Sequence, residues 1–270
     1  MATTTSTTTT TELPIPQPPT HLFTGNLPDT DPSHMLRTYQ TLTAQYGPIF
    51  ALDMVRTRVV YIGSQALATA LCDESRFSKT VAGALLQVRN LTGPGLFTAH
   101  SWEREWALAH TLLMPAFGPL AVRRMFPDML DVAGQMLARW QRFGPEAEID
   151  VSDAFTRLTL DTIALCAFGY RFNSFYRDEM HPFVTSALDA LLESGRRSGR
   201  TGLETRVRRW AGERYERDIE FCWGVCDELV KDRKMRPRGE GEEDLLGIML
   251  RARDGETGEG MSDEVVRYEM

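Results

Sequence analysis

Apolar residues recur at helical spacing along most of this 270-residue chain. Many stretches place hydrophobic side chains three or four positions apart, which is the period of a helix with one buried face. The predicted helices lie at 31–46, 64–72, 84–89, 102–114, 129–140, 152–168, 181–192, 244–250 and 262–270. Two runs rich in β-branched residues, IFALDM and RTRVVYIG, are predicted to pair as strands. The pattern predicts a mainly α fold with a small β-sheet.

The N-terminal end has a different composition from the rest. Residues 2–11 are almost all Thr, and LPIPQPP after them favours an extended backbone. We therefore expect a disordered Thr-rich and Pro-rich lead-in over residues 1–19, followed by one domain without internal repeats. The start has neither the basic nor the apolar region of a signal peptide, and no apolar run approaches the roughly 18 residues that span a bilayer. A cytoplasmic protein without a transmembrane segment is expected.

Charge and cysteine content argue against several classes of function. The net charge is -7, whereas a nucleic-acid-binding protein needs a basic face. The cysteines fit neither a disulfide framework nor a paired zinc motif, so we interpret all four as reduced and structural: Cys72, Cys166, Cys222 and Cys226. The sequence also lacks the GxSxG, GxxxxGK, GxGxxG and HExxH motifs.

One predicted helix carries candidate binding chemistry. Ser101 is expected to cap a helix that runs from Trp102 to Met114. At about 3.6 residues per turn, Trp102, Trp106 and His110 fall on one stripe, which places indole and imidazole N–H groups side by side. Such a donor edge suits an anionic group. The alternative is a helix whose tryptophans fill a core and whose histidine is merely hydrogen-bonded there.

The sequence segments around this helix resemble those of a known protein family. The stretch GPGLFTAHSWEREWALAHTLLMPAF resembles the haem-propionate helix of the cytochrome P-450 monooxygenases. More narrowly, CDESRFSK, RLTLDTIALCAFGYRFNSFYRDEMHPF and DGETGEGMSDEVVRYEM are similar to the haem domain of self-sufficient bacterial and fungal fatty-acid hydroxylases, which are fused to a flavin reductase. The resemblance covers residues 13–270 in unbroken order. It implies that residues 20–270 are the N-terminal part of one haem domain, truncated early in its central helix.

The resemblance implies a haem-dependent monooxygenase. Its substrates would be fatty acids or similar long chains, hydroxylated near the chain terminus with electrons from NADPH that pass through the FAD and FMN of a reductase. The family's cysteine ligand and oxygen-activating threonine would lie beyond Met270, so this chain would hold no catalytic residue or metal ligand and would be inactive alone. Two alternatives remain open: an apolar-ligand-binding helical module without redox chemistry, and a non-catalytic truncated chain.

The resemblance also implies roles for individual residues. Lys79, Trp106 and His110 are expected to bind the haem propionates. Phe97 is expected to set an aromatic ring over the haem face, although a Phe in such a loop is otherwise more often a core residue. Three aliphatic side chains are expected to line the substrate channel: Leu85, Val88 and Leu191.

At the mouth of that channel, related enzymes hold the substrate carboxylate with a tyrosine and an arginine. Tyr61 matches the tyrosine, but Thr57 stands where the arginine would be. Because side chains alternate between the faces of a strand, Arg56 and Arg58 point away from Tyr61 unless a bulge shifts the register. The alternative is that both arginines are ordinary surface residues on an outer strand.

Overall fold

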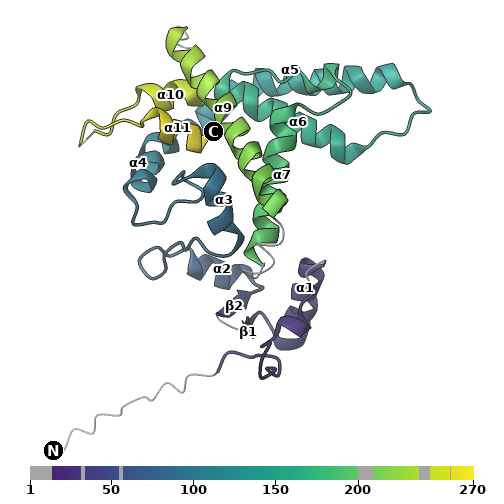
Figure 1. Cartoon of the computed structure of the whole chain (residues 1–270), viewed down its shortest axis with the longest axis vertical. Coiled ribbons are helices and arrows are strands. Elements are labelled where there is room, and N and C mark those ends of the chain that lie inside the picture. The colour runs from purple at the N-terminus through teal and green to yellow at the C-terminus, as the bar shows by residue number, and fades with distance from the viewer. Residues whose placement is uncertain (1–13, 32–33, 55–56, 200–208, 237–243, 256) are drawn as a thin grey trace, which may run out of the picture. The chain divides into compact units, whose positions relative to one another are not determined.

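The computed structural model describes residues 14–31, 34–54, 57–199, 209–236, 244–255 and 257–270. The chain forms two compact units, Met1–Ser78 and Lys79–Met270, each with its own buried hydrophobic residues. Helices dominate, and the strands of the described residues form one two-stranded sheet (Figure 1). The predicted mainly α fold with a small β-sheet is confirmed.

The first unit contains the sheet. The antiparallel strands β1 (Ile49–Asp53) and β2 (Arg58–Ile62) pair in the register Phe50↔Tyr61, and they are flanked by the helices α1 (Met35–Tyr46) and α2 (Gln65–Leu71). A short 3₁₀ turn, η1 (Leu27–Asp29), precedes α1. The core of this unit is Leu42, Phe50 and Leu52. The pairing of the two β-type runs is as predicted.

The predicted lead-in lies partly outside the described residues. Residues 14–19 carry no helix or strand. Their backbone is nevertheless hydrogen-bonded, because the Pro16 carbonyl accepts the Ala51 N–H at 2.8 Å and the buried Asn26 amide donates to the Pro19 carbonyl at 3.2 Å. The prediction for residues 1–13 falls on residues that are not described.

The second unit is helical. In chain order its elements are α3 (Ala84–Thr92), α4 (Arg104–Leu113), η2 (Met114–Phe117), α5 (Pro119–Phe143), α6 (Val151–Phe168), η3 (Ser174–Tyr176), α7 (Pro182–Ser198), α9 (Arg209–Met235), α10 (Leu245–Arg251) and α11 (Asp263–Glu269). Helix α7 packs between α3 and α9, and α5 packs along α6 (Figure 1). Helix α11 contacts both α3 and α9. No helix in the described part of the chain is long and apolar enough to cross a membrane.

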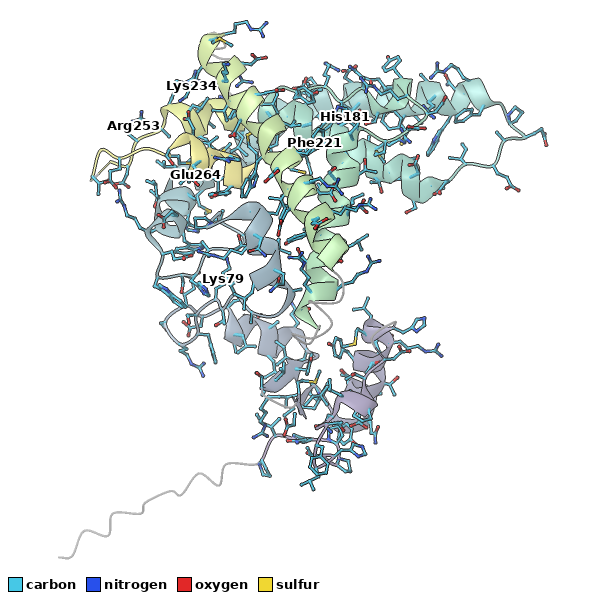
Figure 2. The ribbon with its side chains drawn as sticks, in the orientation of Figure 1. Lys79, His181, Phe221, Lys234, Arg253 and Glu264 are labelled. Carbon is cyan, nitrogen blue, oxygen red and sulfur yellow. The ribbon has the colours of Figure 1, made fainter. Side chains whose placement is uncertain are left out.

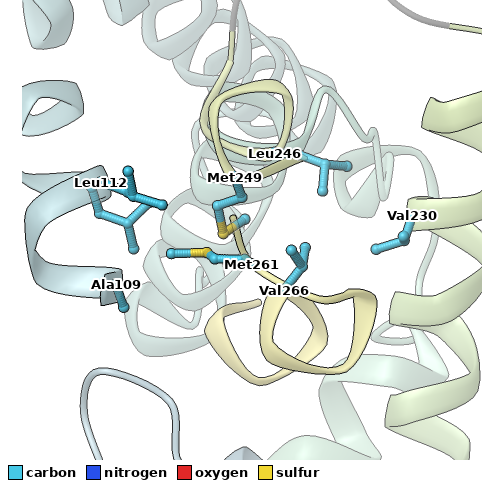
Figure 3. Close-up of a cluster of buried hydrophobic side chains, with 8 residues drawn as sticks. Ala109, Leu112, Val230, Leu246, Met249, Met261 and Val266 are labelled. Atoms are coloured by element: carbon cyan, nitrogen blue, oxygen red, sulfur yellow. The ribbon is translucent and has the colours of Figure 1, made fainter. Parts of the chain in front are cut away.

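A buried hydrophobic cluster fixes the orientation of α4. Its inner side chains, Ala109, Leu112 and Leu113, pack against α10 and α11, with Met249 and Val266 almost completely buried (Figure 3). Burying apolar surface stabilises the fold by roughly 25 cal/mol per Å². Trp106 and His110 lie on a neighbouring stripe of α4 and are not members of this cluster.

Local signals set several helix ends. The hydroxyl groups of Ser64 and Ser262 accept N–H bonds at the starts of α2 and α11, and Gly169 ends α6 with the left-handed φ of 62° that a side chain disfavours. Several predicted starts are wrong. Helix α1 begins at Met35 rather than near Asp31, α5 begins at Pro119 rather than at Met129, and α6 is capped by Asp150 rather than by Ser152.

Helix α6 has exposed apolar side chains and buried charged ones. Phe155 and Ile163 are exposed, whereas Arg157 and Asp161 are only 4% exposed. The reason is the RFNSFYRD segment, whose backbone needs hydrogen-bond partners. Asp161 accepts the Ser174 N–H at 2.9 Å and its hydroxyl at 2.6 Å, while Arg157 donates to three carbonyl groups of the same segment.

Candidate functional site

Helix α4 brings two ring systems together. Trp106 and His110 stack one turn apart, with ring centroids 4.9 Å apart and an angle of 15° between the planes. Trp106 is half-buried and His110 is exposed, so neither fills the core. The indole and the imidazole therefore lie side by side as expected. The alternative, in which both residues belong to the core, is wrong.

The ring nitrogens of this pair are available to an external partner. Among the residues that the structure describes, neither the Trp106 indole N–H nor a His110 ring nitrogen has a hydrogen-bond partner. An indole N–H only donates, and an imidazole donates through one or both nitrogens. The pair therefore fits a carboxylate such as a haem propionate.

Trp102 does not belong to this pair. Helix α4 begins at Arg104, with Glu103 at the N-cap, and Ser101 makes no capping bond to it. Trp102 is 72% exposed and stacks on His100 with centroids 4.3 Å apart. The predicted stripe of three rings is therefore wrong at its first member, because the helix starts two residues later than its composition suggests.

The late start of α4 follows from contacts with α3. The Glu103 carboxylate accepts two bonds from the Arg89 guanidinium, at 2.8 and 2.5 Å, and a third from the His100 N–H at 2.8 Å. The Arg89 bond holds the pKa of Glu103 below its usual value. Arg89 also donates to the carbonyl of the fully buried Thr98. These residues order the loop between α3 and α4, and no motif in the sequence marked Arg89 or Glu103.

Lys79 lies at the same loop. Its ammonium donates to the Leu96 carbonyl at 2.9 Å, so one of its three N–H bonds is used within the chain (Figure 2). Burial lowers the pKa of Lys79, and the charges of Glu269 and Glu103 oppose that shift. Two N–H bonds remain for an anion. The structure records no contact that joins Lys79 to Trp106 or His110.

The predicted channel residues differ in exposure. On α3, Val88 is buried and Leu85 is half-buried, and α3 packs against α7, which carries the exposed Leu191. Phe97 is 68% exposed, so the alternative of a plain core residue is wrong.

An apolar pocket lies elsewhere in this unit. It has a volume of about 90 Å³ and lies among α6, α7 and α9, next to Phe168, Phe172 and Phe183. None of the predicted channel residues lines it. Since a cavity of roughly 150 Å³ holds a ligand the size of benzene, this smaller pocket cannot take a long acyl chain.

Tyr61 belongs to the other unit. Its hydroxyl lies 3.2 Å from that of Tyr39, and its ring stacks on Phe50 at 5.4 Å. Burial and the Tyr39 bond raise its pKa, so the phenol stays protonated. Arg58 is exposed at the start of β2, in agreement with the predicted alternation of faces, and Arg56 lies outside the described residues.

All four cysteines are free; three are buried and Cys72 is exposed. Burial raises the pKa of Cys166, and raises the pKa of Cys222 to about 11 and that of Cys226 to about 12. A cysteine that binds a metal does so as a thiolate, which the burial of these three side chains disfavours. No group of three or more potential metal ligands occurs among the described residues.

Comparison with known proteins assigns the family. The family model described as Cytochrome P-450 matches residues 15–270. A self-sufficient cytochrome P-450 monooxygenase of Phanerodontia chrysosporium is 46% identical over 253 residues, which are 94% of this chain and 24% of the relative. A bifunctional cytochrome P-450/NADPH–P-450 reductase of Bacillus subtilis is 41% identical over 256 residues, 95% of this chain and 24% of the relative.

A third relative, the bifunctional cytochrome P-450/NADPH–P-450 reductase ascE of Acremonium egyptiacum, is 44% identical over 93% of this chain and 24% of its own length. The chain thus spans about a quarter of the length of the curated relatives it matches. The predicted resemblance is confirmed, and with it haem as the cofactor that the family implies. By this match and these identities, the chain belongs to the cytochrome P-450 family of haem-dependent enzymes.

Proposed function

We propose that the protein carrying this chain is a haem monooxygenase that hydroxylates fatty acids or similar long-chain substrates near the chain terminus. Its electrons would come from NADPH through a reductase with FAD and FMN, and it would act in the cytoplasm. The names of the relatives support the oxidative chemistry and the reductase. Within the chain, the observation that carries the proposal is the stacked pair of Trp106 and His110, because a ligand-binding module without haem has no need of this donor edge.

In this proposal α4 holds the carboxylate side of the cofactor. Trp106 and His110 donate to the haem propionates, and Lys79 adds a positive charge. Charge-assisted bonds of this kind are stronger than neutral ones, so three of them hold haem and also fix its orientation. When bound, haem supplies the oxygen-activating chemistry. The residues of this chain bind and orient the cofactor and shape the space beside it.

We infer that the iron ligand is not one of the buried cysteines of this chain. Burial raises the pKa values of Cys166, Cys222 and Cys226, which disfavours the thiolate that an iron ligand needs. We infer that residues 20–270 contribute the propionate side of one haem domain, with residues 1–19 as a lead-in. The thiolate then comes from a part of that domain outside this sequence.

The proposed role of Phe97 can be tested through the products. Because its exposed ring would stand between the substrate terminus and the haem, Phe97→Ala should enlarge that space and shift which carbon is hydroxylated. Chromatography of the hydroxylated products from the haem-loaded protein measures the shift. Phe126→Ala, which removes an exposed ring on α5, is the matched control and should leave the products unchanged. An unchanged distribution in Phe97→Ala would contradict the role.

Tyr61 is proposed to hold the substrate carboxylate with one hydrogen bond and no arginine beside it. A single hydrogen bond to a charged carboxylate contributes about 1.5–3 kcal/mol, so a fatty acid should bind no more than about 100-fold more tightly than the matched alcohol. Tyr61→Phe should remove this difference, whereas Tyr46→Phe, at the end of α1, should keep it. Spectral titration with the two ligands measures both affinities. A much larger preference for the acid would show that an arginine reaches the carboxylate.

A further inference from the structure

The backbone of Leu96 is held from both sides. Its N–H donates to both carboxylate oxygens of Glu269, at 2.9 and 3.1 Å, and its carbonyl accepts the Lys79 ammonium at 2.9 Å. Leu96 immediately precedes the exposed Phe97. The peptide groups that determine where the Phe97 ring points are therefore fixed by two charged side chains from distant parts of the sequence.

The end of α11 also fits closely against this loop. A side chain at the buried Gly95 would begin 2.5 Å from the Tyr268 carbonyl oxygen, and one at Gly93 would begin 2.6 Å from the Tyr268 ring. Gly93 has a φ of 48° and a ψ of -144°, a conformation that is essentially restricted to glycine. The loop and α11 thus approach within backbone contact, which places Glu269 at the Leu96 amide.

We propose that Glu269 is a positioning residue, which fixes the Phe97 ring by holding the Leu96 amide and so helps to decide which substrate carbon is hydroxylated. The inference rests on the role proposed above for Phe97. Glu269 touches neither cofactor nor substrate in this account. It acts only through the backbone of the loop.

The charge of Glu269 makes this hold sensitive to pH. Burial raises its pKa to about 7, while the Leu96 N–H and the charge of Lys79 act in the opposite direction. Glu103 in turn acts on Lys79. The ionised carboxylate is the stronger acceptor, so the Leu96 amide should be held more firmly at pH 8 than at pH 6.

Amide hydrogen exchange at Leu96 tests the hold without measuring activity. In the haem-loaded protein, Glu269→Ala should raise the exchange rate of this amide about tenfold or more relative to the intrinsic rate, because a hydrogen bond to a charged group is lost. Glu269→Gln keeps an acceptor of the same shape and should abolish the difference between pH 6 and pH 8. Glu264→Gln is the control, since Glu264 is exposed on the same helix, away from Lys79, and the glutamine oxygen can still accept the Tyr268 hydroxyl that Glu264 accepts at 2.9 Å (Figure 2).

The distribution of hydroxylated products then tests whether the bond from Leu96 to Glu269 affects the reaction. Glu269→Ala should change the distribution of hydroxylated carbons in the same direction as Phe97→Ala, and Glu264→Gln should not. An unchanged Leu96 exchange rate, or a faster rate with unchanged products, overturns the role of Glu269 and leaves that of Phe97 intact. Unchanged products in Phe97→Ala overturn the role of Phe97 and with it the proposed consequence of the hold.

Discussion

Trp106→Ala should purify with little haem. Removing one donor to a charged carboxylate costs about 1.5–3 kcal/mol, which corresponds to haem binding that is weaker by about 10- to 100-fold. The substitution also removes the stacking of Trp106 on His110, which fixes the position of the second donor. The haem-to-protein ratio after purification and the rate of haem transfer to a scavenger protein both measure it.

Two further variants separate the indole N–H from the ring. Trp106→Phe keeps an aromatic ring against His110 and removes only the donor, so it should lose most of the affinity that Trp106→Ala loses. Trp102→Ala removes a tryptophan that is 72% exposed and precedes α4, and it should keep its haem. Full haem retention in Trp106→Ala would contradict the propionate assignment.

Arg157→Ala should be the most destabilising single substitution considered for the fold. The guanidinium is only 4% exposed and donates to the carbonyl groups of Ser174, Arg177 and Asp178. Truncation to Ala leaves these three carbonyl groups without their hydrogen-bond donor and opens a cavity beside the buried Asp161. We therefore expect a loss of about 3–5 kcal/mol in the free energy of unfolding. A urea titration followed by circular dichroism measures it.

Arg171→Ala provides the matched comparison, since it removes an arginine from the same RFNSFYRD segment. Its pair with Asp131 is about half exposed on both sides, at 47% and 46%, and such surface pairs contribute about 0–1 kcal/mol. Equal effects of the two substitutions would show that the buried hydrogen bonds of Arg157 do not hold the segment.

Features encoded locally could be predicted from the sequence. The two strands, the helices α1 and α2 on either side of them in the sequence, and the helix ends at Ser64, Gly169 and Ser262 depend on residues within a few positions of one another. Helical spacing also sufficed to place Trp106 beside His110, because both lie within the same regular helix.

Features that depend on distant partners could not be predicted. The start of α4 is set by Arg89, which lies 14 residues before Glu103, and the hold on Leu96 comes from Glu269, 173 residues further along. In α6, the polarity of Arg157 and Asp161 predicts that both side chains face solvent, but hydrogen bonds to the RFNSFYRD segment keep them buried. The alternation of faces in β2 was predicted, yet the Tyr39 partner of Tyr61 was not.

Helix α4 is proposed to bind haem through its propionates, and comparing haem with its dimethyl ester tests this binding mode. Esterification removes both negative charges and leaves the ring and the iron unchanged. Reconstituted with each cofactor in turn, the wild-type protein should bind haem at least about tenfold more tightly than the ester, and Trp106→Phe combined with His110→Ala should remove most of that preference. Equal affinity of the wild-type protein for haem and its dimethyl ester would contradict the account.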